Sequence, residues 1–200
     1  MNLNNTIILG LTGSIGMGKT TTAKMFSDYG VPVWDADTTV HQLYKEDEKT
    51  IKIFQKKIPH VVLDNQVSRE ALKNFIIEDK ENLKKIEEII HPLVADHRAD
   101  FLLKAKEKKT PLVVLDIPLL FEKGNETIVD YVVVVTADVK TQKKRVLDRN
   151  TMSEEMFNSI VEKQMTDEEK QLRADFIIPT RSMVFARGKV KEIISNFVGS

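Results

Sequence analysis

The residues best placed to do chemistry lie near the N-terminus, in the segment Gly13-Ser14-Ile15-Gly16-Met17-Gly18-Lys19-Thr20. This segment fits the pattern G-x-x-x-x-G-K-[ST] in full. In such a loop the glycines let backbone N–H groups turn inward around phosphate oxygens, and the following helix adds its positive end. The lysine reaches the β- and γ-phosphates and the hydroxyl binds Mg²⁺. We therefore expect a nucleotide phosphate site, with Lys19 on the phosphates and Thr20 on the metal.

The surroundings of this segment favour binding over the structural alternative, a glycine-rich turn that only lets a helix pack closely on a strand. The segment follows Thr6 to Thr12, which is typical of a buried strand, and precedes Thr20 to Tyr29, a predicted helix that Gly30 ends. No N-K-x-D segment is present to read guanine. We expect ATP contacts along the whole loop: Ser14, Ile15, Gly16, Met17, Gly18, Lys19, Thr20 and Thr21.

An acidic pair, Asp35 and Asp37, follows the next predicted strand, Val31 to Trp34. Ligands of open α/β sheets bind at the carboxyl ends of the strands, where this pair is expected to lie. One carboxylate could accept a proton from an acceptor hydroxyl while the other sits near the metal. The alternative is that the pair only caps a helix from Thr38 onward.

Asp116 ends a third predicted strand, Leu112 to Asp116, and is a candidate ligand of Mg²⁺ or its bound water. A capping or turn role is the alternative, and Glu122 is a weaker candidate for the metal. Beyond the fourth strand, Arg145 and Arg149 could neutralise charge on the transferred phosphoryl group from a mobile lid. The alternative for these arginines is solvation of a helix face.

The elements that must position these residues alternate between strand and helix, which predicts a doubly wound α/β fold. Continuous apolar runs at Leu112 to Asp116 and Tyr131 to Val135 are typical of parallel strands covered on both faces. Residues 38–109 have an almost wholly helical pattern, with Ser68 and Asp79 as N-caps. Pro92 suits the first turn of a new helix, and His91 before it suits a helix entry.

These patterns predict a P-loop NTPase with a three-layer core and a parallel sheet. We assign 1–37, 111–147 and 167–200 to the nucleotide-binding core, 38–110 to a helical insertion that binds the acceptor, and 148–166 to a lid.

The composition limits the class of protein. Lys+Arg and Asp+Glu number 30 each, so the net charge is zero, without the basic excess of nucleic-acid-binding proteins. The sequence has no cysteine, which excludes disulfides and thiolate chemistry. It has no signal-peptide or membrane-span pattern, so we expect a cytoplasmic protein with no membrane partner, either a monomer or a homo-oligomer.

The residues also resemble a known family, the dephospho-CoA kinases. The resemblance begins with L11-T-G-S-I-G-M-G-K-T20 and V33-W-D-A-D37, and continues through S68-R-E-A-L72 and I89-I-H-P-L-V94. It ends with L115-D-I-P-L-L-F-E122, K144-R-V-L-D-R149 and the segment from Gln164 to I178. It covers about nine-tenths of the chain in unbroken order.

This resemblance implies transfer of the ATP γ-phosphate to the ribose 3′-hydroxyl of dephospho-CoA, giving ADP and CoA. It implies that Asp37 is the base, that Arg149 meets the phosphates and that Arg145 contributes to the ATP site. It places Arg69, His91 and Leu119 on the acceptor side. The residues themselves offer Arg69, His97 and Arg98 as candidates for a second anion site.

Four positions depart from the family pattern. Ile77 stands where Phe is usual, and Ile160 stands where we expect Arg. Near the C-terminus Thr180 replaces an Asn and Ser182 replaces a Gly, in a segment expected near the adenine.

Two other functions stay open. One is a P-loop kinase acting on a nucleoside, a nucleoside monophosphate or a small hydroxylated metabolite. The other is a non-catalytic module gated by ATP, which predicts ATP binding without acceptor-dependent turnover.

Overall fold

The computed structural model describes residues 6–149 and 152–198. Within these ranges the chain forms two compact units. The core unit comprises the described residues of 1–34 and 105–200, and the helical unit comprises Asp35–Lys104. The predicted lid, 148–166, includes residues 150 and 151, which lie outside the described residues.

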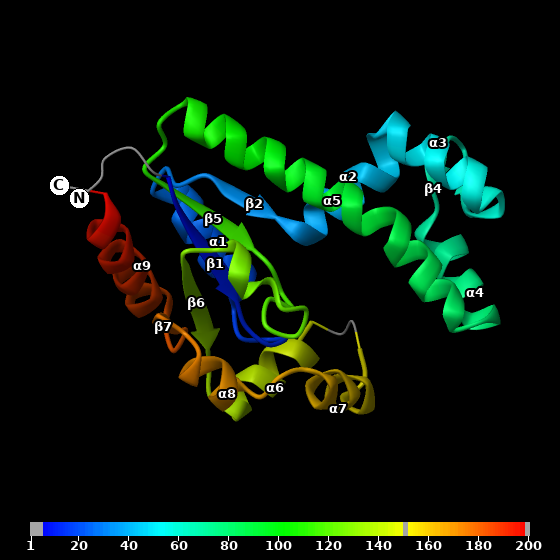
Figure 1. Ribbon diagram of the computed structural model, residues 1–200. Helices are drawn as coiled ribbons and strands as arrows, with labels where there is room; N and C mark the ends of the chain where they lie inside the picture. The colour runs from blue at the N-terminus through cyan, green and yellow to red at the C-terminus, as the bar shows by residue number, and fades with distance from the viewer. Residues whose placement is uncertain (1–5, 150–151, 199–200) are drawn as a thin grey trace. The chain divides into compact units, whose positions relative to one another are not determined.

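The core unit alternates strands with helices along the chain, as predicted (Figure 1). Its elements are β1 (Ile7–Thr12), α1 (Lys19–Asp28), β2 (Val33–Asp35), β5 (Leu112–Asp116), η2 (Asn125–Ile128), β6 (Tyr131–Thr136), α6 (Val139–Leu147), α7 (Glu154–Lys163), α8 (Asp167–Leu172), β7 (Phe176–Pro179) and α9 (Met183–Phe197). The last residue of β2, Asp35, is the first residue of the helical unit.

In the described residues the sheet has five strands in the order β2-β5-β1-β6-β7. The pairs β1–β5, β1–β6 and β6–β7 are parallel, with Leu9 opposite Val114 on one side and Tyr131 on the other. The predicted parallel sheet is confirmed. Parallel strands that share a sheet bring their carboxyl ends to one edge, so the residues after β1, β5, β6 and β7 lie along that edge.

Helices α1 and α9 pack against each other and against one face of this sheet. Phe26 of α1 and Val190 of α9 are fully buried, as are Leu9, Leu11 and Val133 of the strands. The opposite face of the sheet is covered too, since the Val129 and Leu120 side chains lie close to Gly10 of β1. Strands buried on both faces are apolar along their whole length, as β5 is. A rigid apolar core therefore supports the carboxyl edge.

The helical unit has its own core, which includes the fully buried Phe54 and Val61. Its elements are α2 (Ala36–Glu46), α3 (Glu48–Lys57), η1 (Pro59–Val61), β3 (Val62–Leu63), β4 (Gln66–Val67), α4 (Arg69–Glu78) and α5 (Glu81–Glu107), the last of which ends in the core unit. Ser68 caps α4 as predicted, with its hydroxyl accepting from the Ala71 N–H. Asp79 accepts from the Glu81 N–H at the start of α5.

Two predictions for this region were wrong. Pro92 lies inside α5 rather than in the first turn of a new helix, and His91 before it is an interior residue of α5 rather than a helix entry. Proline in a helix interior costs about 3 kcal/mol, and the burial of Ile89, Ile90 and Leu93 beside it offsets that cost. The region also contains an antiparallel hairpin, β3–β4, whose turn residues Asp64 and Asn65 both have positive φ.

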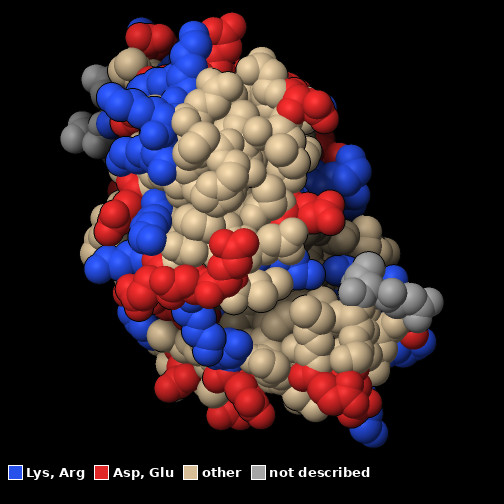
Figure 2. All heavy atoms as spheres, turned by 90° about the vertical axis from the view of Figure 1, so that its right-hand side faces the viewer, with Lys and Arg blue, Asp and Glu red and all other residues tan. Residues whose placement is uncertain are grey.

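The surface carries charges of both signs, as expected from 30 Lys and Arg residues and 30 Asp and Glu residues. On the face drawn in Figure 2, Lys and Arg side chains lie among Asp and Glu side chains. No helix in the described part of the chain is both long enough and apolar enough to cross a membrane.

Candidate active site

The phosphate-binding segment of the sequence forms a loop between β1 and α1. Gly18 precedes α1 with a φ of 96°, a left-handed conformation that favours glycine. At Gly13 a Cβ atom would lie 2.4 Å from Val135 Cγ2 and 2.7 Å from the Val135 carbonyl oxygen. The first glycine is therefore required by the close approach of β6, and the last one by the turn into the helix.

Lys19 is the first residue of α1, and its side chain reaches the end of β5. Its Nζ donates to Asp116 Oδ1 at 2.5 Å. The Asp116 side chain is 1% exposed and that of Lys19 is 15% exposed, so the pair is shielded from water. Charged hydrogen bonds are stronger in such surroundings, and this one fixes the lysine at the carboxyl edge of the sheet.

The oxygen donors near Lys19 suit a hard cation. Thr20 is exposed at the start of α1, and Asp116 supplies a carboxylate. No group of three or more His, Cys, Asp or Glu residues that could hold a metal ion occurs among the described residues. The Thr20 hydroxyl and the Asp116 carboxylate are oxygen donors of the kind that Mg²⁺ uses together with substrate phosphates and water.

Two glutamine side chains hold the peptide groups of Ile15 in the loop. Gln142 of α6 donates from Nε2 to the Ile15 carbonyl at 2.8 Å. Gln164, which ends α7, accepts from the Ile15 N–H through Oε1 at 3.2 Å. The loop is thus tied to α6 and to the end of α7, and the Ile15 N–H already has a partner.

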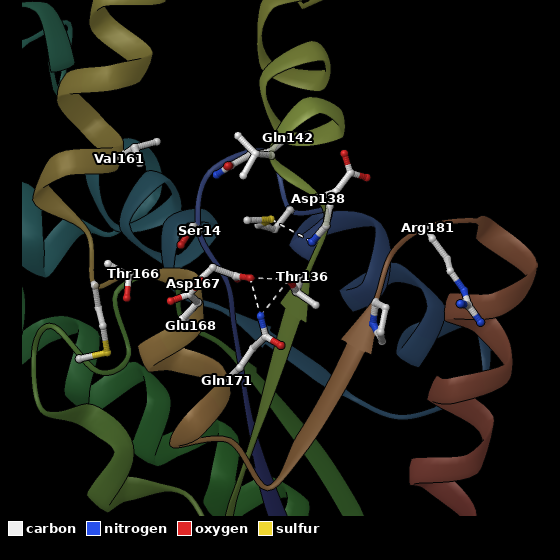
Figure 3. A pocket seen from close by; sticks show the side chains of 15 residues that line it. Ser14, Thr136, Asp138, Gln142, Val161, Thr166, Asp167, Glu168, Gln171 and Arg181 are labelled. Carbon is white, nitrogen blue, oxygen red and sulfur yellow. Dashed lines mark hydrogen bonds between the residues drawn. The ribbon is translucent and has the colours of Figure 1, made fainter.

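A cavity of about 710 Å³ lies beside the loop (Figure 3). Ser14 and Met17 of the loop line it, and Figure 3 shows the other lining residues coming from the ends of β6 and β7 and from α6, α7 and α8. Its size is within the range of pockets that bind small molecules. Because every lining residue belongs to the core unit, this cavity is complete within one compact unit.

One wall of the cavity carries a hydrogen-bonded cluster of three side chains, drawn with dashed lines in Figure 3. Asp167 Oδ2 accepts from the Thr136 hydroxyl at 2.5 Å and from Gln171 Nε2 at 2.7 Å. A further acid at the cavity, Asp138, caps α6, and hydrogen bonds from the Thr141 N–H and hydroxyl hold its pKa below the usual value. The cavity therefore has fixed hydrogen-bonding groups among apolar ones.

Arg145 and Arg149 have different surroundings. Arg145 donates from Nη1 to the Thr180 hydroxyl at 2.8 Å and from Nη2 to the Thr180 carbonyl at 2.6 Å. Arg149 is exposed in the turn after α6, where its N–H donates to the Val146 carbonyl. Thr21, the last of the residues expected to contact ATP, is exposed on α1.

Glu122, the weaker metal candidate, has two other partners. Its Oε1 lies 2.8 Å from Lys170 Nζ, a side chain with no exposed surface. The same oxygen accepts from the Met165 N–H at 3.0 Å. The pair joins the segment after β5 to α8, so Glu122 has a structural contact that the sequence did not suggest.

The acidic pair lies at the start of the helical unit. Asp35 caps α2, since its Oδ1 accepts from the Thr38 N–H at 2.7 Å. The capping alternative therefore describes one contact of Asp35. Asp37 lies in the first turn of the same helix and is exposed, so its carboxylate is accessible for chemistry.

The residues expected on the acceptor side fall in both units. Arg69 begins α4 and is exposed. Its positive charge opposes the rise in the pKa of Tyr44, which burial raises to about 12. His91 is exposed on α5, with Nε2 at 3.8 Å from Glu87 Oε1, while Leu119 is half-buried in the core unit after β5. Burial lowers the pKa of Arg98 on α5.

Comparison with known proteins decides the family. The sequence profile of dephospho-CoA kinase matches residues 7–184 of the chain. The chain belongs to the dephospho-CoA kinase family. A dephospho-CoA kinase from Ruegeria pomeroyi is 48% identical over 189 residues, which are 94% of this chain and 94% of that protein.

Solved structures share the fold of this dephospho-CoA kinase family member. TT1252 from Thermus thermophilus has a TM-score of 0.83 at 31% identity, over 98% of this chain and 100% of that one. A dephospho-CoA kinase from Campylobacter jejuni has a TM-score of 0.65 at 24% identity, over 94% and 96% of the two chains, which is a likeness of fold. The fold is the P-loop NTPase core predicted from the sequence.

The departures from the dephospho-CoA kinase pattern have distinct structural settings. Ile77 is 71% exposed on α4 and Ile160 is half-buried on α7. Ser182 caps α9 by accepting from the Phe185 N–H at 3.2 Å. Thr180 is buried beside the phosphate loop, where its hydroxyl lies 2.8 Å from the Met17 carbonyl oxygen.

Sequence reasoning missed Gln142, Lys170 and Asp167. Gln164 entered only as the start of a segment of resemblance. All four act through contacts with residues far away in the sequence, and a polar residue in a helix is by itself unremarkable. The one signal available was their place after the fourth predicted strand, and of the four only Gln164 lies in the expected lid, 148–166.

Proposed function

We propose that this chain transfers the γ-phosphoryl group of ATP to the ribose 3′-hydroxyl of dephospho-CoA, giving ADP and CoA. The observation that carries the proposal is the phosphate loop, in a chain that belongs to the dephospho-CoA kinase family. The loop leads into Lys19, whose side chain is held by Asp116 at the carboxyl edge of the sheet. A loop of this kind binds the phosphates of a nucleotide, and the lysine neutralises their charge.

On the donor side, Lys19 and the backbone N–H groups of the loop, apart from that of Ile15, hold the phosphates in this proposal. Thr20 and Asp116 hold Mg²⁺, which when bound neutralises charge on the β- and γ-phosphates. The adenine occupies the cavity beside the loop, which Pro179 and Arg181 line near the β7 end. Arg145 supports that side of the ATP site through its contacts with Thr180.

On the acceptor side, Asp37 is the proposed base. Its carboxylate orients the 3′-hydroxyl and takes its proton as the hydroxyl oxygen forms a bond to the γ-phosphorus. The bond from that phosphorus to the oxygen of the β-phosphate breaks, and ADP leaves. Catalysis comes chiefly from positioning and charge neutralisation, with Arg149 on the transferring group. Asp35 Oδ1 caps α2, and the other carboxylate oxygen, Oδ2, is directed toward the metal in this proposal.

Binding of dephospho-CoA needs a second anion site, because the acceptor itself carries phosphate. We assign this role to Arg69 and His91, with Leu119 contacting the acceptor as the family resemblance implies. The segment 148–166 acts as the lid. We place the reaction in the cytoplasm, as expected from the sequence, with the protein a monomer or a homo-oligomer.

The test is to incubate the protein with ATP, Mg²⁺ and dephospho-CoA and to separate the products by chromatography. The proposal predicts ADP and CoA in equal amounts, with the new phosphate on the 3′-oxygen. A matched reaction with an acceptor that lacks the 3′-hydroxyl should give no phosphorylated product. ADP and inorganic phosphate without CoA would overturn the proposal.

A further inference from the structure

Thr180 directly follows β7 and contacts the phosphate loop. Its side chain is buried, and its hydroxyl oxygen lies 2.8 Å from the Met17 carbonyl oxygen and 3.0 Å from the Thr136 carbonyl oxygen. Its backbone N–H donates to the Thr136 carbonyl at 2.7 Å. Thr180 therefore joins the end of β6 to the loop after β1.

The same side chain fits closely against the glycine that ends the loop. A Cβ atom on Gly18 would lie 3.3 Å from both the hydroxyl and the methyl group of Thr180. Gly18 has a left-handed φ and directly precedes Lys19. The Thr180 side chain therefore packs against the backbone from which the Lys19 side chain extends. The contact is with the binding loop and not only with the framework.

Thr180 also determines where Arg145 points. Arg145 donates to both the hydroxyl and the carbonyl oxygen of Thr180, at 2.8 and 2.6 Å. A threonine hydroxyl has one hydrogen to donate and lone pairs to accept with. Because the hydroxyl oxygen accepts from the arginine, its single hydrogen is left for the carbonyls: the Met17 oxygen at 2.8 Å is the nearer acceptor, and the Thr136 oxygen at 3.0 Å already accepts from the Thr180 N–H. One hydroxyl thus links the guanidinium to the loop backbone.

We propose that Thr180 is a positioning residue of the ATP site, which fixes the phosphate loop through the Met17 carbonyl and orients the guanidinium of Arg145. Its hydroxyl supplies both a donor and an acceptor, the two capacities that the Asn expected at this position also has. The inference rests on the proposed function in one respect only, namely that the loop binds the phosphates of ATP.

The test compares Thr180→Val, which keeps the shape and removes the hydroxyl, with Thr180→Ser, which keeps the hydroxyl. Binding of ATP with Mg²⁺ is measured by titration calorimetry without acceptor, so the result does not depend on the acceptor's identity. We expect Thr180→Val to weaken ATP binding about tenfold, the effect of losing one buried hydrogen bond, and Thr180→Ser to restore most of it. In turnover assays the KM for ATP should rise while the KM for dephospho-CoA stays constant.

Thr50→Val is the matched control, because Thr50 is buried in the helical unit and its hydroxyl has no hydrogen-bond partner among the described residues. It should leave ATP binding unchanged. If Thr180→Val does not fold, as judged by its circular dichroism, Thr180→Ala replaces it. Unchanged ATP affinity in a folded Thr180 variant without the hydroxyl overturns the inference, as does an equal loss in Thr180→Ser. If the wild type binds ATP but does not phosphorylate dephospho-CoA, the proposed reaction fails while the test of Thr180 stands.

Discussion

Lys19 and Asp116 come from different elements, the start of α1 and the end of β5, and meet in a hydrogen bond of 2.5 Å between Nζ and Oδ1. The two residues are 97 positions apart in the sequence. The parallel register of β1 and β5, in which Leu11 lies opposite Asp116, explains the contact. The pair thus connects the phosphate loop to the metal candidate.

The first prediction concerns this lysine. Lys19→Ala removes the cation that neutralises the β- and γ-phosphates, so we expect turnover to fall by at least about a hundredfold. Steady-state ADP release measures it. Lys24→Ala is the control on the same helix, because Lys24 is exposed and pairs with Asp28 at 3.2 Å. Comparable losses in both variants would contradict the assignment of Lys19.

The second prediction separates the two acids after β2. Asp37→Asn removes the proposed base and should lower turnover by about 10²–10⁴-fold while ATP binding stays nearly intact. Asp35→Asn keeps a good N-cap residue and should cost less, since Asp35 Oδ1 is engaged with the Thr38 N–H. Turnover and ATP affinity are measured for both variants. Full turnover in Asp37→Asn would show that the base lies elsewhere.

The strands, the phosphate loop and its helix could be predicted from the sequence because their signals are local. Apolar runs mark the buried strands, and the loop pattern fixes which residues face phosphate. Asp116 could be proposed for the same reason, as the polar residue that ends an apolar strand. Its contact with Lys19 depends on strand order, which the sequence does not state.

The rest could not be predicted because it depends on tertiary contacts. The partner of Glu122 is Lys170, 48 positions later, and a lysine on an amphipathic helix normally suggests exposure. Pro92 follows the local rule for a helix start, yet burial of its neighbours keeps α5 continuous. The β3–β4 hairpin is the exception, because its signal is local: Asp64-Asn65 directly follows the apolar residues Val61 to Leu63 and is typical of a tight turn.

The third prediction uses the buried ion pair of Glu122 and Lys170. Lys170→Met leaves the Glu122 carboxylate without its cation, and breaking a buried pair in this way costs about 3–5 kcal/mol of unfolding free energy. Lys170→Met combined with Glu122→Gln removes both charges and keeps an acceptor for the Met165 N–H, so it should recover most of the loss. Urea unfolding of the wild type, Lys170→Met, Glu122→Gln and the double variant measures the effect. An additive or larger loss in the double variant would rule out the pairing as the cause.

The fourth prediction concerns acid. Hydrogen bonds from Lys24 and then Arg187 hold the pKa of Asp28 below its ordinary value of 3.8. Because the folded state favours the ionised carboxylate, its contribution to stability is present above that value and is lost as the pH falls through the lowered pKa. Asp28→Asn should therefore lower the melting temperature near neutral pH, by at most about 3 °C for an exposed pair.

The melting curves of wild type and Asp28→Asn should converge at low pH, and high salt should narrow the difference at neutral pH. Since Arg187 lies on α9 and Asp28 on α1, the pair joins the two helices that cover one face of the sheet. A difference that persists unchanged into strong acid would mean that the ionised carboxylate is not its source.

The most direct test of the central claim is the rate of ADP release with ATP and Mg²⁺, measured without acceptor and then with a panel of acceptors. The panel contains dephospho-CoA, nucleosides, nucleoside monophosphates and small hydroxylated metabolites. We predict turnover with dephospho-CoA that far exceeds turnover with any other member and yields CoA. Preferred turnover with another acceptor would keep the kinase and contradict the proposed substrate, and ATP binding without turnover on any acceptor would contradict the proposed enzyme.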